Sequence, residues 1–299
     1  MIQEKNTKKL QVKPGKRIKL KDFLTGWEAN GELKEAGKDA VKGQALELLE
    51  ESRARLSRAQ ELLWAGDTWS VLLILQGMDT AGKDGTIKHV MSGVNPQGCR
   101  VTSFKVPTHE ETDHDFLWRY SGKLPERGEI GVFNRSYYED VLVVKVHPDL
   151  LNSQQLPRGR RGKNFWDQRY EDINCFERHL VRDGTLILKF FLHISKDEQK
   201  RRLLERLENR EKYWKFSLAD LAERQYWGDY QKAYEMMLAK TSTDIAPWYI
   251  IPADYKWAAR TLVSDIIAKR IESLSLRYPK VSREQMALIE QARDELTME

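Results

Sequence analysis

The sequence predicts an α/β protein built on a parallel sheet of about five strands flanked by helices. The first observation is a set of short apolar runs, clearest at 71–75 (VLLIL), because a parallel strand is buried on both faces. The second is the alternation of such runs with helical patterns, which requires crossover connections. The third is a Gly-x-x-x-x-Gly-Lys segment at 77–83, directly after the first run.

The elements follow one another along the chain without a convincing linker. Strands are expected at 71–75, 101–106, 130–133, 185–194 and 248–252. Helices are expected at 43–64, 85–92, 110–120, 137–144, 165–182, 196–211, 222–239, 255–273 and 282–296. Residues 1–42 are rich in Lys and Glu and are predicted to form a loosely structured lead-in. One domain over 43–299 is therefore expected.

Composition limits the function classes only broadly. Apolar residues make up 40% and charged residues 32%, and the net charge is +5, as in many soluble globular proteins. Cys99 and Cys175 have no metal-ligand spacing and are too few for a disulfide framework. We find neither a signal-peptide pattern nor an apolar stretch that approaches the roughly 18 residues of a membrane span. A cytoplasmic protein that does not bind membranes is expected.

The glycine-rich segment predicts a phosphate-binding loop. It leaves an apolar strand and enters a helix, where backbone N–H groups and the helix dipole attract an anion. Gly77 and Gly82 allow a close approach of the backbone, and Lys83 supplies a positive charge. The remaining loop residues expected to bind phosphate are Thr80, Ala81 and Gly85.

Two carboxylates distinguish this loop from the usual nucleotide-binding form. Asp84 stands where a Ser or Thr normally coordinates magnesium, and Asp79 lies inside the loop. Carboxylates repel a polyphosphate unless a cation lies between them. Asp79 and Asp84 are therefore expected to hold one or two Mg²⁺ ions as the cofactor.

A second polar cluster follows the predicted strand 130–133. Ligands of α/β sheets lie beyond the carboxyl ends of the strands, so Arg135 is expected to point toward the phosphates. Glu139 and Asp140 open the next helix near the same crevice. The alternative is that Arg135 only pairs with Glu139 on a helix surface, four residues on.

The segment 196–215 contains eight basic residues and predicts a cationic clamp. Arg202, Arg206 and Arg210 recur every four residues, which places them on one helix face. A row of guanidinium groups at a phosphate site would stabilise charge and suits a long polyanion. The basic loop at 157–163 either contributes to this site or is simply solvated.

Five segments together resemble the polyphosphate kinase 2 family, in order from about residue 12 to residue 278. The segments are 77–85 (GMDTAGKDG), 94–98 (VNPQG), 104–108 (FKVPT), 133–142 (FNRSYYEDVL) and 214–217 (WKFS). The resemblance implies a P-loop kinase fold, similar to thymidylate kinases, with a helical lid at about 150–215. It also implies Mg²⁺-dependent transfer of the terminal phosphoryl group of inorganic polyphosphate to a nucleotide.

Residue roles follow from the same resemblance. By position, the family's catalytic residues correspond to Asp79, Lys83, Arg135 and Arg206. Lys215 lies in the lid, and Lys105 lies in the segment expected to face the acceptor base. Asn134 replaces the Asp of many relatives, so Asp79 and Asp84 would carry the metal.

The resemblance also sets the expected acceptor and assembly. The pattern Asn-Arg-Ser-x-Tyr-Glu, which ends at Glu139, is similar to the subgroup that accepts AMP and ADP. A homodimer or homotetramer is implied. Nucleic acid is not an expected partner, because no reader motif with stacking aromatics is present. The competing hypothesis is an ATP-dependent nucleotide kinase of the thymidylate kinase type.

Overall fold

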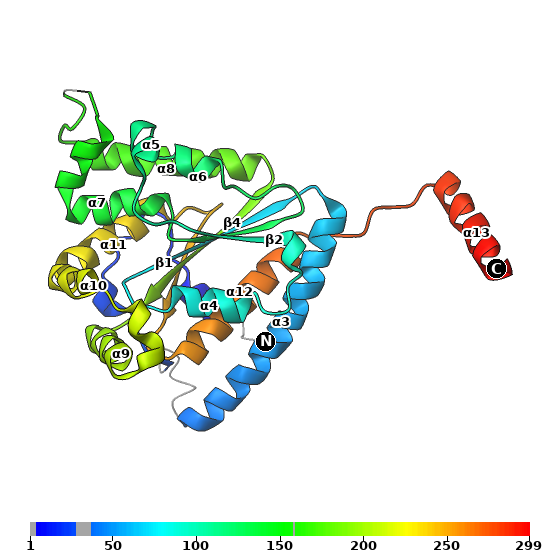
Figure 1. Ribbon diagram of the computed structural model, residues 1–299, viewed down its shortest axis with the longest axis horizontal. Coiled ribbons are helices and arrows are strands. Elements are labelled where there is room, and N and C mark those ends of the chain that lie inside the picture. The colour runs from blue at the N-terminus through cyan, green and yellow to red at the C-terminus, as the bar shows by residue number, and fades with distance from the viewer. Residues whose placement is uncertain (1–3, 28–36, 158) are drawn as a thin grey trace.

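The protein is described by a computed structural model that covers residues 4–27, 37–157 and 159–299. Its centre is a five-stranded parallel sheet with the strand order β2-β3-β1-β4-β5 (Figure 1). The strands are β1 Ser70–Gly77, β2 Cys99–Ser103, β3 Ile130–Asn134, β4 Thr185–His193 and β5 Trp248–Pro252. The predicted α/β class and the five parallel strands are confirmed.

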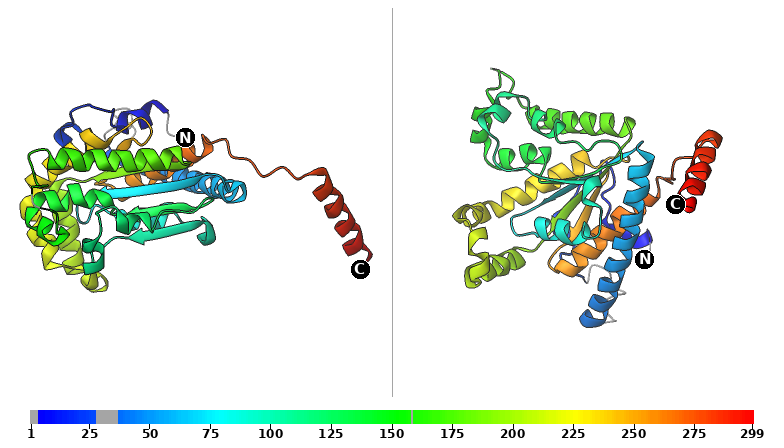
Figure 2. Two further views of the ribbon diagram at one scale, coloured as in Figure 1. Left: turned by 90° about the horizontal axis from the view of Figure 1, so that it is seen from above. Right: turned by 45° about the vertical axis from the view of Figure 1, so that its right-hand side comes forward.

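Helices cover both faces of the sheet (Figures 1 and 2). One face packs on α8 (Phe165–Arg182) and α11 (Trp227–Thr241). The other packs on α3 (Lys38–Gly66), α4 (Lys83–Val90) and α12 (Lys256–Glu272). Every residue of the central strands β1 and β4 is buried, because both strands have helices on either side. This burial explains why their sequences are almost continuously apolar, with the buried Lys189 in the middle of β4 as the main exception.

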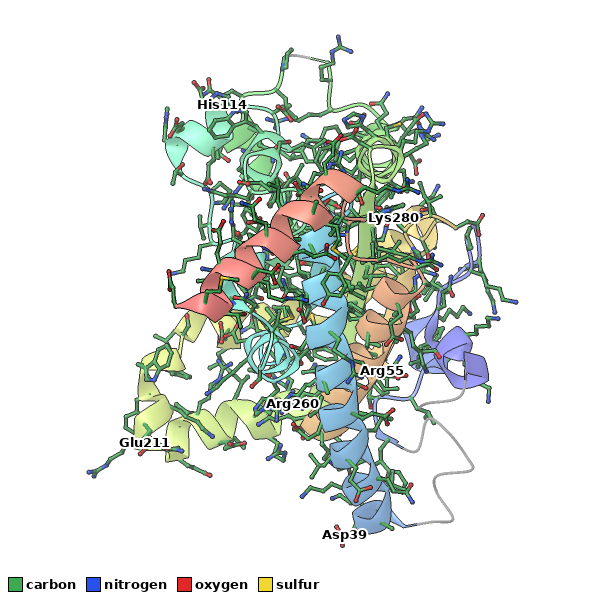
Figure 3. All side chains as sticks on the ribbon, turned by 90° about the vertical axis from the view of Figure 1, so that its right-hand side faces the viewer. Asp39, Arg55, His114, Glu211, Arg260 and Lys280 are labelled. Atoms are coloured by element: carbon green, nitrogen blue, oxygen red, sulfur yellow. The ribbon has the colours of Figure 1, made fainter. Side chains whose placement is uncertain are left out.

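The long helix α3 is tied to α12 by buried charge. Arg55 of α3, labelled in Figure 3, forms an ion pair with Glu272 and another, at 3.3 Å, with the fully buried Asp265. Lys269 donates to the other carboxylate oxygen of Asp265 at 2.7 Å. A buried carboxylate with two cationic partners is satisfied rather than destabilising. The two helices thereby form a firm support behind β1.

Several predicted helices are broken into shorter pieces. The segment 110–120 forms α5 (His109–Asp113) and α6 (Trp118–Ser121), because His114 is extended and Asp115 caps a new turn at Leu117 N. The segment 137–144 forms the 3-10 helix η4 (Tyr137–Val141) followed by α7 (Val143–Val146). Residues 222–239 divide among α10 (Leu218–Glu223), η7 (Arg224–Tyr226) and α11.

The amino-terminal segment is more ordered than the sequence indicated. In residues 4–27, α1 (Glu4–Leu10) and η1 (Leu20–Asp22) flank a stretch that lies along β5, where Val12 N donates to Trp248 O at 2.9 Å. Val12, Ile18 and Leu20 are buried in the core. The expectation of a loosely structured lead-in is therefore wrong for this stretch. The part at 28–36 lies outside the described residues.

The predicted lid range of 150–215 does not form one unit. It contains α8 and β4, and β4 lies at the centre of the sheet. A lid role is left for its two ends: the segment around η5 (Pro148–Gln154), and α9 (Lys196–Glu208) with η6 (Arg210–Lys215). Arg158 of the basic loop 157–163 lies outside the described residues. Among the described helices, none combines the length and the apolar character required to cross a bilayer.

Candidate active site

The phosphate loop joins β1 to α4, as predicted. Gly82 has a φ of 102°, in the left-handed region that favours glycine, and it caps α4. Gly77 is needed for a different reason, because a Cβ atom there would lie 2.9 Å from the carbonyl oxygen of Leu192 on β4. Its role is close packing of the loop against the neighbouring strand.

Lys83 lies inside the loop that it follows. Its Nζ donates to Gly77 O at 2.6 Å and to Met78 O at 3.4 Å, and the residue is only 9% exposed. Burial, with a further contribution from the charge of Arg135, lowers the pKa of Lys83. The ammonium group is thus held at a fixed place between the loop carbonyls and a cavity that lies over the phosphate loop.

Arg135 follows the carboxyl end of β3 and reaches the loop. It has a φ of 64°, which is rare for a residue with a side chain, and its N–H donates to Leu75 O at 3.1 Å. Its Nη2 donates to Asp79 Oδ1 at 2.9 Å, and its Nη1 lies 3.5 Å from Glu139 Oε2. The pKa of Arg135 is raised, mainly by Glu139. The predicted crevice contact and the alternative helical pair are both present.

The second loop carboxylate has a neutral partner. Asn134 Nδ2 donates to Asp84 Oδ1 at 2.6 Å and to Ser103 Oγ at 3.2 Å. Asn134 therefore orients Asp84 and adds no charge. The role of the loop carboxylates Asp79 and Asp84 as metal ligands stays a prediction.

The turn that carries Arg135 is anchored from below by a buried ion pair. Tyr137 and Tyr138 both donate to Glu177 Oε1 of α8, at 2.8 and 2.7 Å. Lys189 of β4 donates to Glu177 Oε2 at 2.6 Å, and burial lowers the pKa of Lys189. Removing one partner from such a buried pair costs about 3–5 kcal/mol. The tyrosines thus fix the end of β3 to the interior.

Glu139 lies on this turn, beneath Arg135. Gln76 Nε2 donates to Glu139 Oε1 at 2.8 Å, so Gln76 and Arg135 together orient the carboxylate. Glu139 is not among the side chains that line the cavity over the phosphate loop. A direct contact of Glu139 with the acceptor therefore stays a prediction.

The three arginines predicted to form one row have different roles. Arg202 is buried and donates to the loop carbonyls of Thr80 and Ala81 at 2.9 and 3.0 Å, and also to Ala253 and Asp254. Its guanidinium supports the loop backbone and also lines the cavity over the loop, and its predicted phosphate contact stays a prediction. One turn later, Arg206 lines the cavity and donates to Asp220 Oδ2 at 3.0 Å.

Arg210 is not part of the row. The helix α9 ends at Glu208, because Asn209 is extended and its side chain caps the N–H of Glu211 at the start of η6. The four-residue spacing therefore stops before Arg210, which is exposed and does not line the cavity. Lys215 ends η6, and its side chain lies outside the described part of the chain.

A cavity of about 710 Å³ lies over the phosphate loop. Of the residues predicted from the sequence, it is lined by Asp79, Thr80, Ala81, Gly82, Lys83, Asp84, Gly85, Lys105, Asn134, Arg135, Arg202 and Arg206. The sequence reasoning missed Ser103, Asp220, Lys256 and Arg260, whereas Lys212 was counted among the basic residues of the clamp at 196–215. A Cβ atom at Gly85 would lie 3.4 Å from Arg260 Nη2, so α12 brings this cation directly against the loop.

One signal could have identified the missed cations. Lys256 begins α12 shortly after the carboxyl end of β5, where ligands of parallel sheets bind, and Arg260 follows one turn later. Burial lowers the pKa of both side chains. In Arg260 the charge of Arg202 adds to this effect. Cations gathered this closely favour an anionic ligand of high charge.

The opposite wall of the cavity carries the segment expected to face the acceptor base. Lys105 and Val106 line the cavity, whereas Phe104 also packs against Tyr120 and Phe133 in the core. Arg119 donates to Lys105 O at 3.1 Å. Arg119 therefore supports this wall from behind.

Comparison with known proteins gives the relatives of this chain. The model of the polyphosphate kinase 2 (PPK2) family matches residues 39–279. The ADP-polyphosphate phosphotransferase of Rhodopseudomonas palustris is 52% identical, over 94% of this chain and 99% of the relative. The AMP/ADP-polyphosphate phosphotransferase of Meiothermus ruber is 49% identical, over 91% and 96%.

A solved structure agrees with these relatives. The crystal structure of polyphosphate kinase 2 from Arthrobacter aurescens TC1 matches with a TM-score of 0.75 at 45% identity. The match covers 84% of this chain and 87% of that one. This likeness confirms the predicted P-loop kinase fold.

Proposed function

The chain belongs to the polyphosphate kinase 2 family, and we propose that it transfers the terminal phosphoryl group of inorganic polyphosphate to AMP and to ADP. The observation that carries this proposal is the cation-lined cavity over the phosphate loop. Besides Lys83 and Arg135, the cavity is lined by Lys212, Lys256 and Arg260. An ATP donor would need a surface for its base there, whereas a polyphosphate chain needs only positive charge.

The proposed reaction is an in-line displacement at the terminal phosphorus of polyphosphate. An oxygen of the nucleotide's terminal phosphate forms the new P–O bond, while the bond to the next phosphate of the chain breaks. The leaving polyphosphate is one unit shorter and keeps the electron pair of the broken bond. The attacking oxygen is already anionic at neutral pH, so no strong general base is required.

The protein contributes charge and position. Lys83, Arg135 and Arg206 surround the place where the transferred group would lie, and they neutralise its oxygens. The hydrogen bond from Arg135 to Asp79 fixes the guanidinium before substrate arrives, so little reorganisation is needed during transfer.

A divalent metal cofactor suits a kinase of this family, and Mg²⁺ is our proposal. Asp79 and Asp84 both line the cavity and would hold it. Within the described ranges, no group of three or more His, Cys, Asp or Glu side chains is arranged to hold a metal. Two carboxylates fit Mg²⁺ well, because this ion usually keeps water and takes substrate phosphate oxygens as its other ligands. When bound, it would neutralise phosphate charge next to the loop.

Glu139 is proposed to set the acceptor range. Two relatives of nearly equal identity are named for different acceptors, one for ADP and the other for AMP and ADP. Glu139 shares Arg135 with Asp79, so a change at position 139 alters the position of the guanidinium. We also propose a cytoplasmic location, a homodimer or homotetramer, and no nucleic-acid partner.

The deciding experiment supplies AMP, Mg²⁺ and polyphosphate without ATP and follows ADP and ATP by ion-exchange chromatography. We expect ADP first and ATP later. Absence of ADP, with ADP formed once ATP is added, would instead indicate an ATP-dependent nucleotide kinase. The same assay with AMP, ADP, GMP and GDP, on wild type and Glu139→Asn, tests the acceptor proposal. Equal use of AMP by both proteins would reject the role of Glu139, and Glu126→Gln serves as a surface control.

A further inference from the structure

The carboxyl-terminal arm of the chain stands clear of the body. It consists of the linker 275–281 and the helix α13 (Arg283–Met298), and it leaves the body at the end of α12 (Figures 1 and 2). Tyr278 donates to Glu61 Oε1 of α3 at 2.9 Å and holds the start of the arm. Figure 3 looks at the molecule from the side of the arm, with Lys280 labelled in the linker. Every residue from 277 to 299 is exposed.

The helix α13 has the features of a packed helix. A capping box joins Ser282 and Gln285 at its start. One stripe along the helix is apolar and consists of Met286, Leu288, Ile289, Ala292 and Leu296. Leu288 and Leu296 are 64% and 70% exposed. A helix of about this length is marginal in water without tertiary contacts, so α13 requires a surface that covers its stripe.

The charges of the chain indicate what that surface is. The segment from residue 283 to residue 299 contains five acidic and two basic side chains, so its net charge is −3. The whole chain carries +5, so the preceding residues carry +8. Residues 8–21, here called the basic strip, contain seven Lys and Arg side chains, all exposed, and no carboxylate. The hydrogen bond from Val12 N to Trp248 O holds the strip in place along β5.

We propose that α13 docks on the basic strip of a second copy of this chain. The acidic residues beside the stripe face the strip's cations, and Leu24, 60% exposed next to the strip, offers an apolar contact. A linker of seven extended residues reaches roughly 23 Å, enough to bridge to a neighbouring molecule. Each copy docks its α13 on the basic strip of the other, so the two contacts are related by a two-fold axis.

This contact lies beyond the catalytic part of the chain. The family model ends at residue 279, before α13 begins. None of the strip or arm residues lines the cavity over the phosphate loop. The assembly can therefore be tested by mass alone, independently of phosphoryl transfer.

The first experiment measures the mass of the full-length protein in solution by analytical ultracentrifugation at one protein concentration. Wild type is expected at twice the chain mass or a multiple of this. Ile289→Lys puts a positive charge into the stripe, against the cations of the strip, and should reduce the mass by half. Ala287→Lys adds the same charge in the same turn, outside the stripe, and should leave the mass unchanged. A monomeric wild type, or equal masses for the two variants, would overturn the proposal.

The second experiment identifies the receiving surface by charge exchange. Glu290 and Glu295 flank the stripe, one turn after Met286 and two turns after Leu288. Glu290→Lys with Glu295→Lys should reduce the mass by half, as should Lys13→Glu with Lys16→Glu. The protein that carries all four changes should recover the wild-type mass. If it stays at half mass, the basic strip is not the partner surface of α13. Circular dichroism checks that each variant keeps its fold.

Discussion

Arg135 donates from Nη2 to Asp79 Oδ1 across 2.9 Å, which joins the end of β3 to the phosphate loop. The two residues are brought together because β1 and β3 are neighbouring parallel strands, so their carboxyl ends meet at one edge of the sheet. The pair places a fixed positive charge beside a carboxylate that must otherwise repel phosphate. In the proposed mechanism, this pair connects the carboxylate that would hold Mg²⁺ with the guanidinium that would stabilise the transferred group.

Replacing Arg135 by Lys should reduce kcat for phosphoryl transfer by about 10²–10³. A lysine keeps the charge but loses the forked contact with Asp79 and Glu139. Steady-state kinetics with ADP and polyphosphate measure the effect. Arg127→Lys, at a surface pair with Asp183, is the matched control and should keep full activity. A fall of less than tenfold in Arg135→Lys would contradict the assigned role.

Replacing Arg202 by Lys should lower the free energy of unfolding by about 1–3 kcal/mol and also weaken catalysis, because loop carbonyls lose their donors. Arg201 is the control, since it also pairs with Glu198 but has an exposed side chain. Urea denaturation and hydrogen exchange of residues 79–82 provide the measurements. If Arg201→Lys and Arg202→Lys behave alike, Arg202 does not support the loop.

Removing the cations of α12 should weaken binding of long polyphosphate. Lys256→Met and Arg260→Met are each expected to raise KM for a long chain about tenfold, the effect of one charged hydrogen bond. The KM for tripolyphosphate should rise less, because this short donor does not extend far from Lys83. Lys88→Met, on α4 but not lining the cavity, serves as the control. Equal effects on long and short donors would exclude a track along α12.

Asp140 should make stability depend on pH. Burial raises the pKa of Asp140 from 3.8 to about 6, so the folded protein holds this proton more tightly than the unfolded chain. The contribution of this proton to the free energy of unfolding is fully present below pH 4. It is lost as the pH rises through 6, and the loss is about 3 kcal/mol at most. Asp140→Asn, whose side-chain oxygen still accepts from Gln154, should keep its free energy of unfolding over this range.

The measurement for Asp140 is urea denaturation from pH 4 to pH 7. The difference in unfolding free energy between Asp140→Asn and wild type should grow as the pH rises. The exposed Asp149→Asn provides the baseline. A difference that stays constant over this range would show that Asp140 titrates normally.

The sequence predicted those parts of the site that depend on local order. The loop at 77–83 could be identified because a buried strand, glycines and a lysine follow one another within a few residues. Arg135 could be placed because it directly follows a strand of the sheet. Both predictions require only the strand direction and a rule about where parallel strands end.

Other parts depend on how distant segments pack. Helical spacing correctly put Arg202 and Arg206 on one helix, but it could not show that Arg202 is buried against the loop carbonyls while Arg206 pairs with Asp220. Lys256 and Arg260 are far from the loop in sequence and reach it only through the path from β5 into α12. The order of the amino-terminal segment was missed because its apolar residues are separated by lysines.

The tyrosine anchor beneath the turn has a consequence for how this enzyme family diversifies. Tyr137 and Tyr138 hold the turn through Glu177, so the turn does not depend on the side chain at position 139. Selection can therefore change residue 139 in a single step without losing the turn, while the guanidinium of Arg135 shifts in response. Under the proposed role of Glu139, the choice between one and two acceptors is an evolutionary variable that costs little stability, and directed evolution of new acceptors would do well to begin there.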